Sequence, residues 1–148
     1  STAIDAATNG MINAGVTTVV AAGNGNIFGI AQNACNYSPA RVPNAITVGA
    51  TTSTDAKASY SNYGTCLDIF APGSSITSAS HSSATGSKVL SGTSMASPHV
   101  AGVAALHLQG SPAATPQQVR DAIVNNSTPS KVTSAGSGSP NRLLFTAY

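Results

Sequence analysis

Charge is what this sequence has least of. Only 7% of its 148 residues are charged, against about a quarter in a typical soluble domain. Glutamate is absent, so the carboxylates available for acid–base or metal chemistry are four aspartates: Asp5, Asp55, Asp68 and Asp121. The net charge is +2 and the basic residues form no cluster. We therefore expect no nucleic acid among the partners.

Long apolar runs are absent as well. No stretch of the chain approaches the ~20 apolar residues that a membrane-spanning helix needs, so we expect no membrane partner. The low charge does not indicate disorder, because 41% of the residues are hydrophobic. A length of 148 residues fits one domain or part of one.

Cysteine is scarce. The two cysteines, Cys35 and Cys66, both lie beside turn-forming residues such as Asn36 and Gly64. A disulfide is easy to accommodate in such places, but the residues alone leave a bridge and two buried thiols equally open.

Helix and strand signals alternate along the first part of the chain. Residues 1–15 have the capping residues and apolar spacing of a helix, and the β-branched run 16–22 follows as a strand. A helix leading into an apolar strand is typical of a parallel sheet in an α/β fold. Further strands are predicted at 45–51, 66–71, 76–79, 88–90 and, as an edge strand, 143–148.

Three helices are predicted, each from a different pattern. The second helix, from Ser94 to about Gln109, has small or apolar residues on all sides, so we expect it to be buried. The third begins at Thr115, with Pro116 in its first turn and Gln118 as a capping-box partner. The first carries an apolar stripe made of Ile4, Ala7, Met11 and Ile12.

The segment GTSMASPHVAG, residues 92–102, places Ser94 in a tight turn where the second helix begins. A serine at a helix N-terminus has free backbone N–H groups beside its oxygen and the positive end of the helix dipole behind it. Enzymes that transfer acyl groups use such surroundings for a nucleophile, because negative charge develops there on the substrate carbonyl oxygen. The alternative is an ordinary serine cap on a buried helix.

The same segment resembles the nucleophile motif of the subtilisin-like serine peptidases, particularly their proteinase K branch and its aqualysin-like members. Further segments resemble that family: VVAAGNGN (19–26), NYSPARVPNAITVGAT (36–51), SNYGTCLDIFAPG (61–73) and SPNRLLFTAY (139–148). The resemblance implies a three-layer α/β fold with a mainly parallel sheet, of which this chain is the C-terminal part. It also implies hydrolysis of peptide bonds in protein or peptide substrates.

The resemblance assigns roles to residues of the substrate site. Ser94 is implied as the nucleophile, and Asn24 as the side chain that stabilises the oxyanion together with the backbone N–H of Ser94. Ala21, Ala22 and Gly23 are implied as one wall of the substrate pocket. The residues alone favour a turn asparagine between two glycines at Asn24, and they allow residues 21–23 to be a strand end packed under a helix.

A structural calcium ion is a further implication of the resemblance. Asp68 would supply a carboxylate, and Pro43 and Ala45 would supply backbone carbonyl oxygens. One carboxylate, two carbonyls and waters are reasonable ligands for Ca²⁺. The alternative is an aspartate that accepts hydrogen bonds from N–H groups of a loop.

The resemblance also implies a disulfide between Cys35 and Cys66. Disulfides persist in oxidising surroundings, so this pairing predicts a secreted, extracellular protein.

The family's catalytic Asp and His motifs are absent from the sequence. Three histidines are present, but His99 and His107 follow Ser94 on its own helix and His81 lies in a serine-rich loop. We therefore expect residues 1–148 to be the C-terminal part of one catalytic domain, inactive alone and partnered by the N-terminal part. The alternative is a secreted remnant that keeps the fold without hydrolysis. GTSMA is not G-x-S-x-G, which argues against an esterase with the α/β-hydrolase fold.

Overall fold

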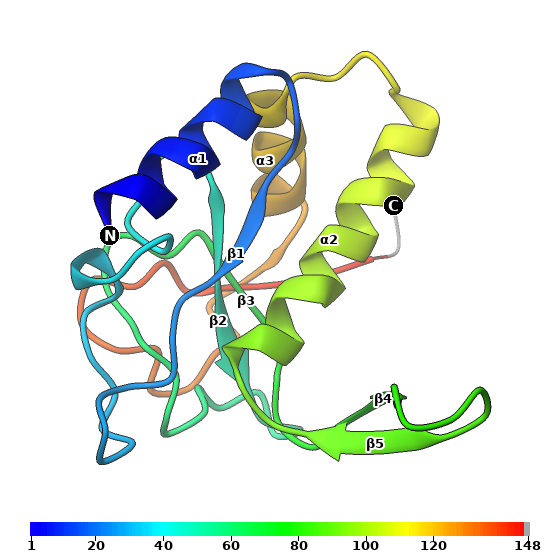
Figure 1. The fold of residues 1–148 in the computed structure, drawn as a ribbon. Coiled ribbons are helices and arrows are strands. Elements are labelled where there is room, and N and C mark those ends of the chain that lie inside the picture. Colours follow the sequence, from blue (N-terminus) through cyan, green and yellow to red (C-terminus); the bar gives the residue numbers. More distant parts are fainter. Residues whose placement is uncertain (147–148) are drawn as a thin grey trace.

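The computed structural model describes residues 1–146 and places a five-stranded sheet between helices on its two faces (Figure 1). In their order across the sheet, the strands are β1 (Val19–Ala21), β2 (Ile46–Thr51), β3 (Ile69–Pro72), β7 (Arg142–Leu143) and β6 (Thr128–Pro129). Strands β1, β2, β3 and β7 run parallel, and β6 is antiparallel to β7. The predicted α/β class with a mainly parallel sheet is confirmed.

The other elements are α1 (Thr2–Asn13), the 3-10 turn η1 (Ala34–Asn36), β4 (Ile76–Ala79), β5 (Ser87–Leu90), α2 (Thr93–Gly110) and α3 (Pro116–Asn125). Helix α1 packs on one face of the sheet through Ile12, whereas α2 and α3 pack on the other face. Strands β4 and β5 form an antiparallel hairpin that projects from the body of the molecule just ahead of α2 (Figure 1).

Two of the helix starts are fixed by the side chains that the sequence indicated. The Ser1 hydroxyl accepts a hydrogen bond from the Ile4 N–H at the start of α1. At the start of α3, the Gln118 N–H donates to Thr115 Oγ1 and the Thr115 N–H donates to Gln118 Oε1, at 3.2 and 2.9 Å. This reciprocal capping satisfies N–H groups that have no partner within the helix.

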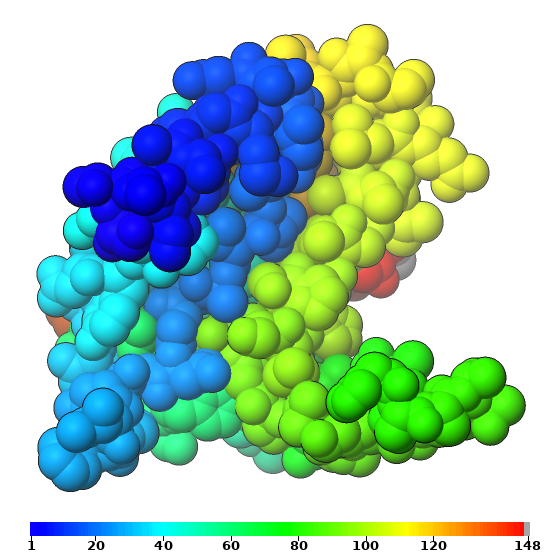
Figure 2. Space-filling model, viewed as in Figure 1, coloured from blue at the N-terminus to red at the C-terminus, as the bar shows by residue number. Residues whose placement is uncertain are grey.

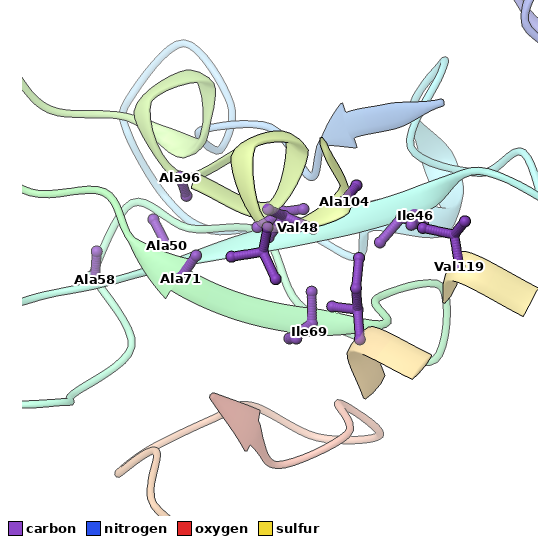
Figure 3. Close-up of a cluster of buried hydrophobic side chains, with 12 residues drawn as sticks. Ile46, Val48, Ala50, Ala58, Ile69, Ala71, Ala96, Ala104 and Val119 are labelled. Carbon is purple, nitrogen blue, oxygen red and sulfur yellow. The ribbon is translucent and has the colours of Figure 1, made fainter. Parts of the chain in front are cut away.

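The main core lies between the sheet and the helices α2 and α3 (Figure 3). Alternate residues of β2 and β3 face this core, as the two-residue period of a strand requires. They meet small side chains of α2, of which Ala96 lies beside Ala50 and Ala71 near the carboxyl ends of β2 and β3 (Figure 3). The sheet and α2 therefore fix the N-terminus of α2 at the end of the parallel strands, where ligands bind in open α/β sheets.

The strand predictions differ from the structure mainly at their ends. Strand β1 begins at Val19 instead of residue 16, and β3 begins at Ile69 instead of residue 66. The strand predicted at 143–148 is β7 (Arg142–Leu143), and it lies inside the sheet between β3 and β6 instead of at its edge. Residues 147 and 148 of that prediction lie outside the described residues.

The helix-burial predictions were partly wrong. In α1, Ile4 and Met11 of the predicted apolar stripe are 48% and 49% exposed, and Thr8 is the buried residue. In α2, Val100 and other residues are buried as expected, but Leu106 is 61% exposed. Helices α1 and α2 both border the molecular face turned toward the viewer in Figure 2. The exposed apolar side chains of these two helices are ones that the described residues do not cover.

Candidate active site

Ser94 is the second residue of α2, and its side chain is exposed to solvent. The preceding Gly92 is the helix cap, and it provides no side chain that could bond the first N–H groups. A Cβ atom at Gly92 would lie 3.1 Å from Asn24 Nδ2, so a side chain at this position would push the Asn24 amide out of place by a few tenths of an ångström. The predicted tight turn of small residues is thus present, and it leaves the Ser94 hydroxyl accessible.

Asn24 follows β1 and reaches the start of α2. Its Oδ1 accepts two hydrogen bonds from Thr93, one from the backbone N–H and one from the hydroxyl, both at 2.8 Å. With the oxygen held in this way, the Nδ2 amide group is the free, donating end of the side chain. Asn24 is exposed, so this donor is open to a molecule bound beside Ser94.

Thr93 is a residue of this site that the sequence analysis did not identify. Its side chain is fully buried, and Oγ1 accepts a hydrogen bond from the Gly23 N–H at 3.1 Å while its proton goes to Asn24 Oδ1. One hydroxyl thereby joins two adjacent residues of the segment after β1 to the first turn of α2. Its place directly before the candidate nucleophile was the signal available in the sequence.

Asn62 is the second residue that the analysis missed. It is fully buried, and its Oδ1 accepts hydrogen bonds from the N–H groups of Gly25 and Gln32 at 3.0 and 2.8 Å. Its Nδ2 donates to the Ala22 carbonyl at 2.9 Å. One side chain therefore holds both ends of the loop that follows Asn24. The signal was a polar residue inside the SNYG segment, which the resemblance had already marked.

The predicted pocket wall is only partly available. Gly23 and Ala21 are half-buried and have surface to offer. Ala22 is a correction: its side chain is fully buried in the core, its N–H donates to the Val48 carbonyl and its own carbonyl accepts from Asn62. Ala22 therefore supports the wall from behind and has no surface for a substrate.

A cavity of about 300 Å³ adjoins Ser94, between the β4 strand and the first turns of α2. His99 is one of its lining residues, but its Nδ1 lies 2.8 Å from the Met95 carbonyl oxygen of the same helix. Because a carbonyl only accepts, Nδ1 carries the proton and the ring is tied to its own helix. Among residues 1–146, no histidine is hydrogen-bonded to Ser94.

The predicted calcium ligands do not fit Ca²⁺ in the arrangement that the structure shows. Asp68 Oδ2 accepts a hydrogen bond from the Thr47 N–H at 2.7 Å, and Oδ1 accepts one from the guanidinium group of Arg120. The same guanidinium donates to the Pro43 carbonyl at 2.8 Å. Ala45 is buried, and its N–H bonds the Val42 carbonyl. A side-chain cation thus already bonds two of the three predicted donors.

Burial raises the pKa of Asp68, while the hydrogen bond from Thr47 and the charge and hydrogen bond of Arg120 oppose the rise. The part of the chain that the structure describes contains no cluster of three or more His, Cys, Asp or Glu side chains that could hold a metal ion.

The disulfide between Cys35 and Cys66 is confirmed, with 5.3 Å between the two Cα atoms. It joins η1 to the segment that enters β3. None of the helices within residues 1–146 is both long and apolar enough to cross a bilayer.

Comparison with known proteins gives consistent matches over the whole chain. The Extracellular serine proteinase of Thermus sp. (strain Rt41A) is 61% identical over 148 residues, which are all of this chain and 35% of that protein. The Alkaline serine exoprotease A of Vibrio alginolyticus is 52% identical over 98% of this chain and 26% of its own length. Among solved structures, a cold adapted subtilisin-like serine proteinase aligns with a TM-score of 0.92 and 49% identity, over all of this chain and 51% of that one.

The chain thus spans about a third of the curated relatives that it matches and about half of the matching solved structure. The sequence profile of the Subtilase family matches residues 1–144. This match, the relatives and the shared fold together show that the chain belongs to the subtilase family.

Proposed function

We propose that this chain carries the nucleophile and the oxyanion-binding groups of a secreted serine endopeptidase. The observation that carries the proposal is the orientation of Asn24: Thr93, the residue before Ser94, holds its oxygen, and its Nδ2 donor has no hydrogen-bond partner among residues 1–146. The bond from the Thr93 N–H also satisfies a donor at the start of α2, for which Gly92 has no side chain, so the resulting direction of Nδ2, and not the bond alone, supports the proposal.

In the proposed reaction, Ser94 Oγ attacks the carbonyl carbon of the scissile peptide bond and loses its proton to a histidine. The carbonyl oxygen becomes an oxyanion, which accepts hydrogen bonds from Asn24 Nδ2 and from the Ser94 N–H at the positive end of α2. The histidine then protonates the leaving amine, and water releases the acyl group from Ser94 in a second step. Gly23 and Ala21 offer a flat backbone surface against which a substrate side chain lies.

The catalytic histidine and aspartate are proposed to come from a part of the catalytic domain outside these 148 residues. His99 is hydrogen-bonded to Met95, and neither of the other two histidines is hydrogen-bonded to Ser94 among the described residues. The unpaired edge of β1 and the exposed side of α2 are the surfaces on which the rest of the domain would pack. Residues 1–148 are proposed to be the C-terminal part of that one domain.

Secretion is supported by the disulfide and by the name of the extracellular relative from Thermus. Subtilases generally bind calcium, and a structural calcium ion in the complete domain stays a prediction. At Asp68 and Pro43 the donors are engaged by Arg120, and no step of the proposed reaction depends on a metal ion.

The test is covalent labelling with a fluorophosphonate probe, which reacts with an activated serine. The chain is assayed alone, and then as part of the complete catalytic domain. We expect labelling only in the complete domain, its loss in Ser94→Ala and its retention in Ser97→Ala, a matched change one turn along the same helix. An unlabelled, correctly folded complete domain would instead favour the non-catalytic remnant, because the serine would then lack a functional base.

A further inference from the structure

We propose that the guanidinium group of Arg120 takes the place of a structural calcium ion at Asp68 and Pro43. This region of the fold would then be held together by a side-chain cation, independently of metal. The proposal goes beyond the peptidase function and does not depend on it.

The guanidinium group of Arg120 bridges the Asp68 carboxylate and the Pro43 carbonyl. Arg120 projects from α3, and its two terminal nitrogens bond two different partners. Nη1 donates to the Pro43 carbonyl at 2.8 Å, and Nη2 donates to Asp68 Oδ1. The planar guanidinium group presents several donors in a fixed fork, which suits such simultaneous bonds to a carbonyl and a carboxylate. A calcium ion at this place would have to use the same two oxygens.

The charges around the site disfavour a divalent ion. The side chain of Asp68 is 7% exposed and that of Arg120 is 27% exposed, so solvent screens this pair less than a surface pair. Both Arg120 and Arg41 line an adjoining hollow of about 170 Å³, and Arg41 is already paired with Asp5. Asp5 compensates the charge of Arg41, but calcium would still meet the fixed charge of Arg120 bonded to Asp68. It would also need further oxygen donors beyond Asp68 and Pro43, because it normally takes six to eight oxygen ligands.

The same bonds connect three segments that are distant in sequence. Pro43 lies in the turn before β2, Asp68 lies directly before β3, and Arg120 lies in α3. The Cys35–Cys66 disulfide borders the same hollow. The disulfide and the Arg120 ion pair thus both cross-link the segments at this end of the sheet. The ion pair is present whenever the chain is folded, whereas the occupancy of an ion site depends on the calcium concentration.

The experiment uses the complete protein that carries this chain, in a Ser94→Ala background that prevents self-digestion. Calcium binding is measured by isothermal titration calorimetry in the parent protein, in Asp68→Asn and in Arg120→Ala. We expect Asp68→Asn to bind the same number of calcium ions as the parent, because no ion uses Asp68. We expect Arg120→Ala to gain one calcium ion, since its removal frees Asp68 and the Pro43 carbonyl.

Melting temperatures provide a second measurement, which does not depend on counting bound calcium ions. Arg120→Gln keeps a polar side chain of similar length, and we expect it to melt lower than the parent by the same amount in calcium and in a chelator. Asp121→Asn, on the exposed side of α3, is the matched control and should melt like the parent. A loss of one bound calcium ion in Asp68→Asn would overturn the proposal, because it would show that the parent binds the ion there.

Discussion

At the scale of single residues, the candidate site depends on which end of the Asn24 amide faces the substrate. The oxygen end accepts two hydrogen bonds from Thr93, and rotating the amide would place Nδ2 against the Thr93 N–H. Two donors in contact would leave both without a partner, which is unfavourable near a buried residue. Thr93 therefore orients Asn24, although it has no surface of its own for a substrate.

The first prediction concerns Asn24→Ala in the complete domain. The variant loses a donor that is used only when the oxyanion forms, so we expect kcat to fall while KM stays nearly constant. The size should be ~10²–10³, the loss known for the oxyanion asparagine of a subtilisin and carried over from it. Steady-state kinetics on a peptide substrate measure both constants. Asn26→Ala, two residues further on and also exposed, is the control; a rise in KM alone would contradict the role of Asn24.

Sequence reasoning proposed Ser94 and Asn24 as site residues but gave no role to Thr93 and Asn62, and the reason is physical. The hydrogen bonds of Thr93 to Asn24 and of Asn62 to Gly25 join residues 69 and 37 positions apart. Local patterns reveal turns and caps, whereas contacts of this range follow only from how β1, the loop after it and α2 pack. The motifs therefore predicted the candidate reacting residues, but not the residues that hold them in place.

At the scale of elements, the loop after β1 depends on Asn62 for its shape. Its side chain bonds Ala22 and Gly25 where the loop leaves β1, and Gln32 where the loop returns. A Cβ atom at Gly23 would lie 2.5 Å from Asn62 Nδ2, so the two residues are fitted closely together. The loop is thereby anchored beneath Asn24.

The second prediction is that Asn62→Ala destabilises the complete domain by at least about 2 kcal/mol. The change leaves two N–H groups and one carbonyl without their buried partner, and each such loss costs about 1–3 kcal/mol. Urea unfolding followed by circular dichroism measures the difference. Asn62→Asp keeps the acceptor oxygen but buries a carboxylate whose second oxygen faces the Ala22 carbonyl, so we expect a loss at least as large. Equal stability of Asn62→Ala and the parent would show that water replaces the side chain.

The third prediction concerns the bond between Cys35 and Cys66, which encloses a loop with a sequence separation of 31 residues. Closing a loop of this size restricts the unfolded chain, which is worth about 3–4 kcal/mol in the chain-entropy account. We expect the double variant Cys35→Ala/Cys66→Ala to lose that amount in chemical unfolding under oxidising conditions. The parent protein in reducing agent should unfold like the variant, and a persistent difference between them would argue against the chain-entropy explanation.

The elements themselves were predictable to different degrees. Helix α3 was predicted from its start because the capping box at Thr115 is a local signal. Strand β7 was misplaced because a two-residue strand takes its position from its neighbours β3 and β6. The stripe of α1 was misassigned because apolar spacing predicts which residues share a face, and not whether this chain covers that face. The disulfide followed from the family resemblance and not from the spacing of the cysteines.

At the scale of the whole molecule, one side of the structure carries features that normally lie inside a protein. Strand β1 is hydrogen-bonded to β2 on one side only, so its other edge is open among the described residues. Leu106 on α2, Met11 on α1 and Val16 before β1 are 61%, 49% and 47% exposed. An open strand edge beside apolar side chains favours association with another polypeptide. The relatives are about three times as long, which agrees with a partner segment in the same protein.

The fourth prediction tests this face through Leu106→Ser. In the complete domain, where we expect other residues to cover Leu106, the change should cost about 1.5–3 kcal/mol of stability, the value of burying such a side chain. In the 148-residue chain alone, where Leu106 is exposed, the same change should reduce self-association in analytical ultracentrifugation. Gln109→Ser is the control, because Gln109 is an exposed polar side chain of the same helix and should alter neither measurement. Equal stability of the complete domain with and without Leu106→Ser would mean that this face stays open, and the proposed catalytic histidine and aspartate would then have to approach Ser94 from the β4–β5 side.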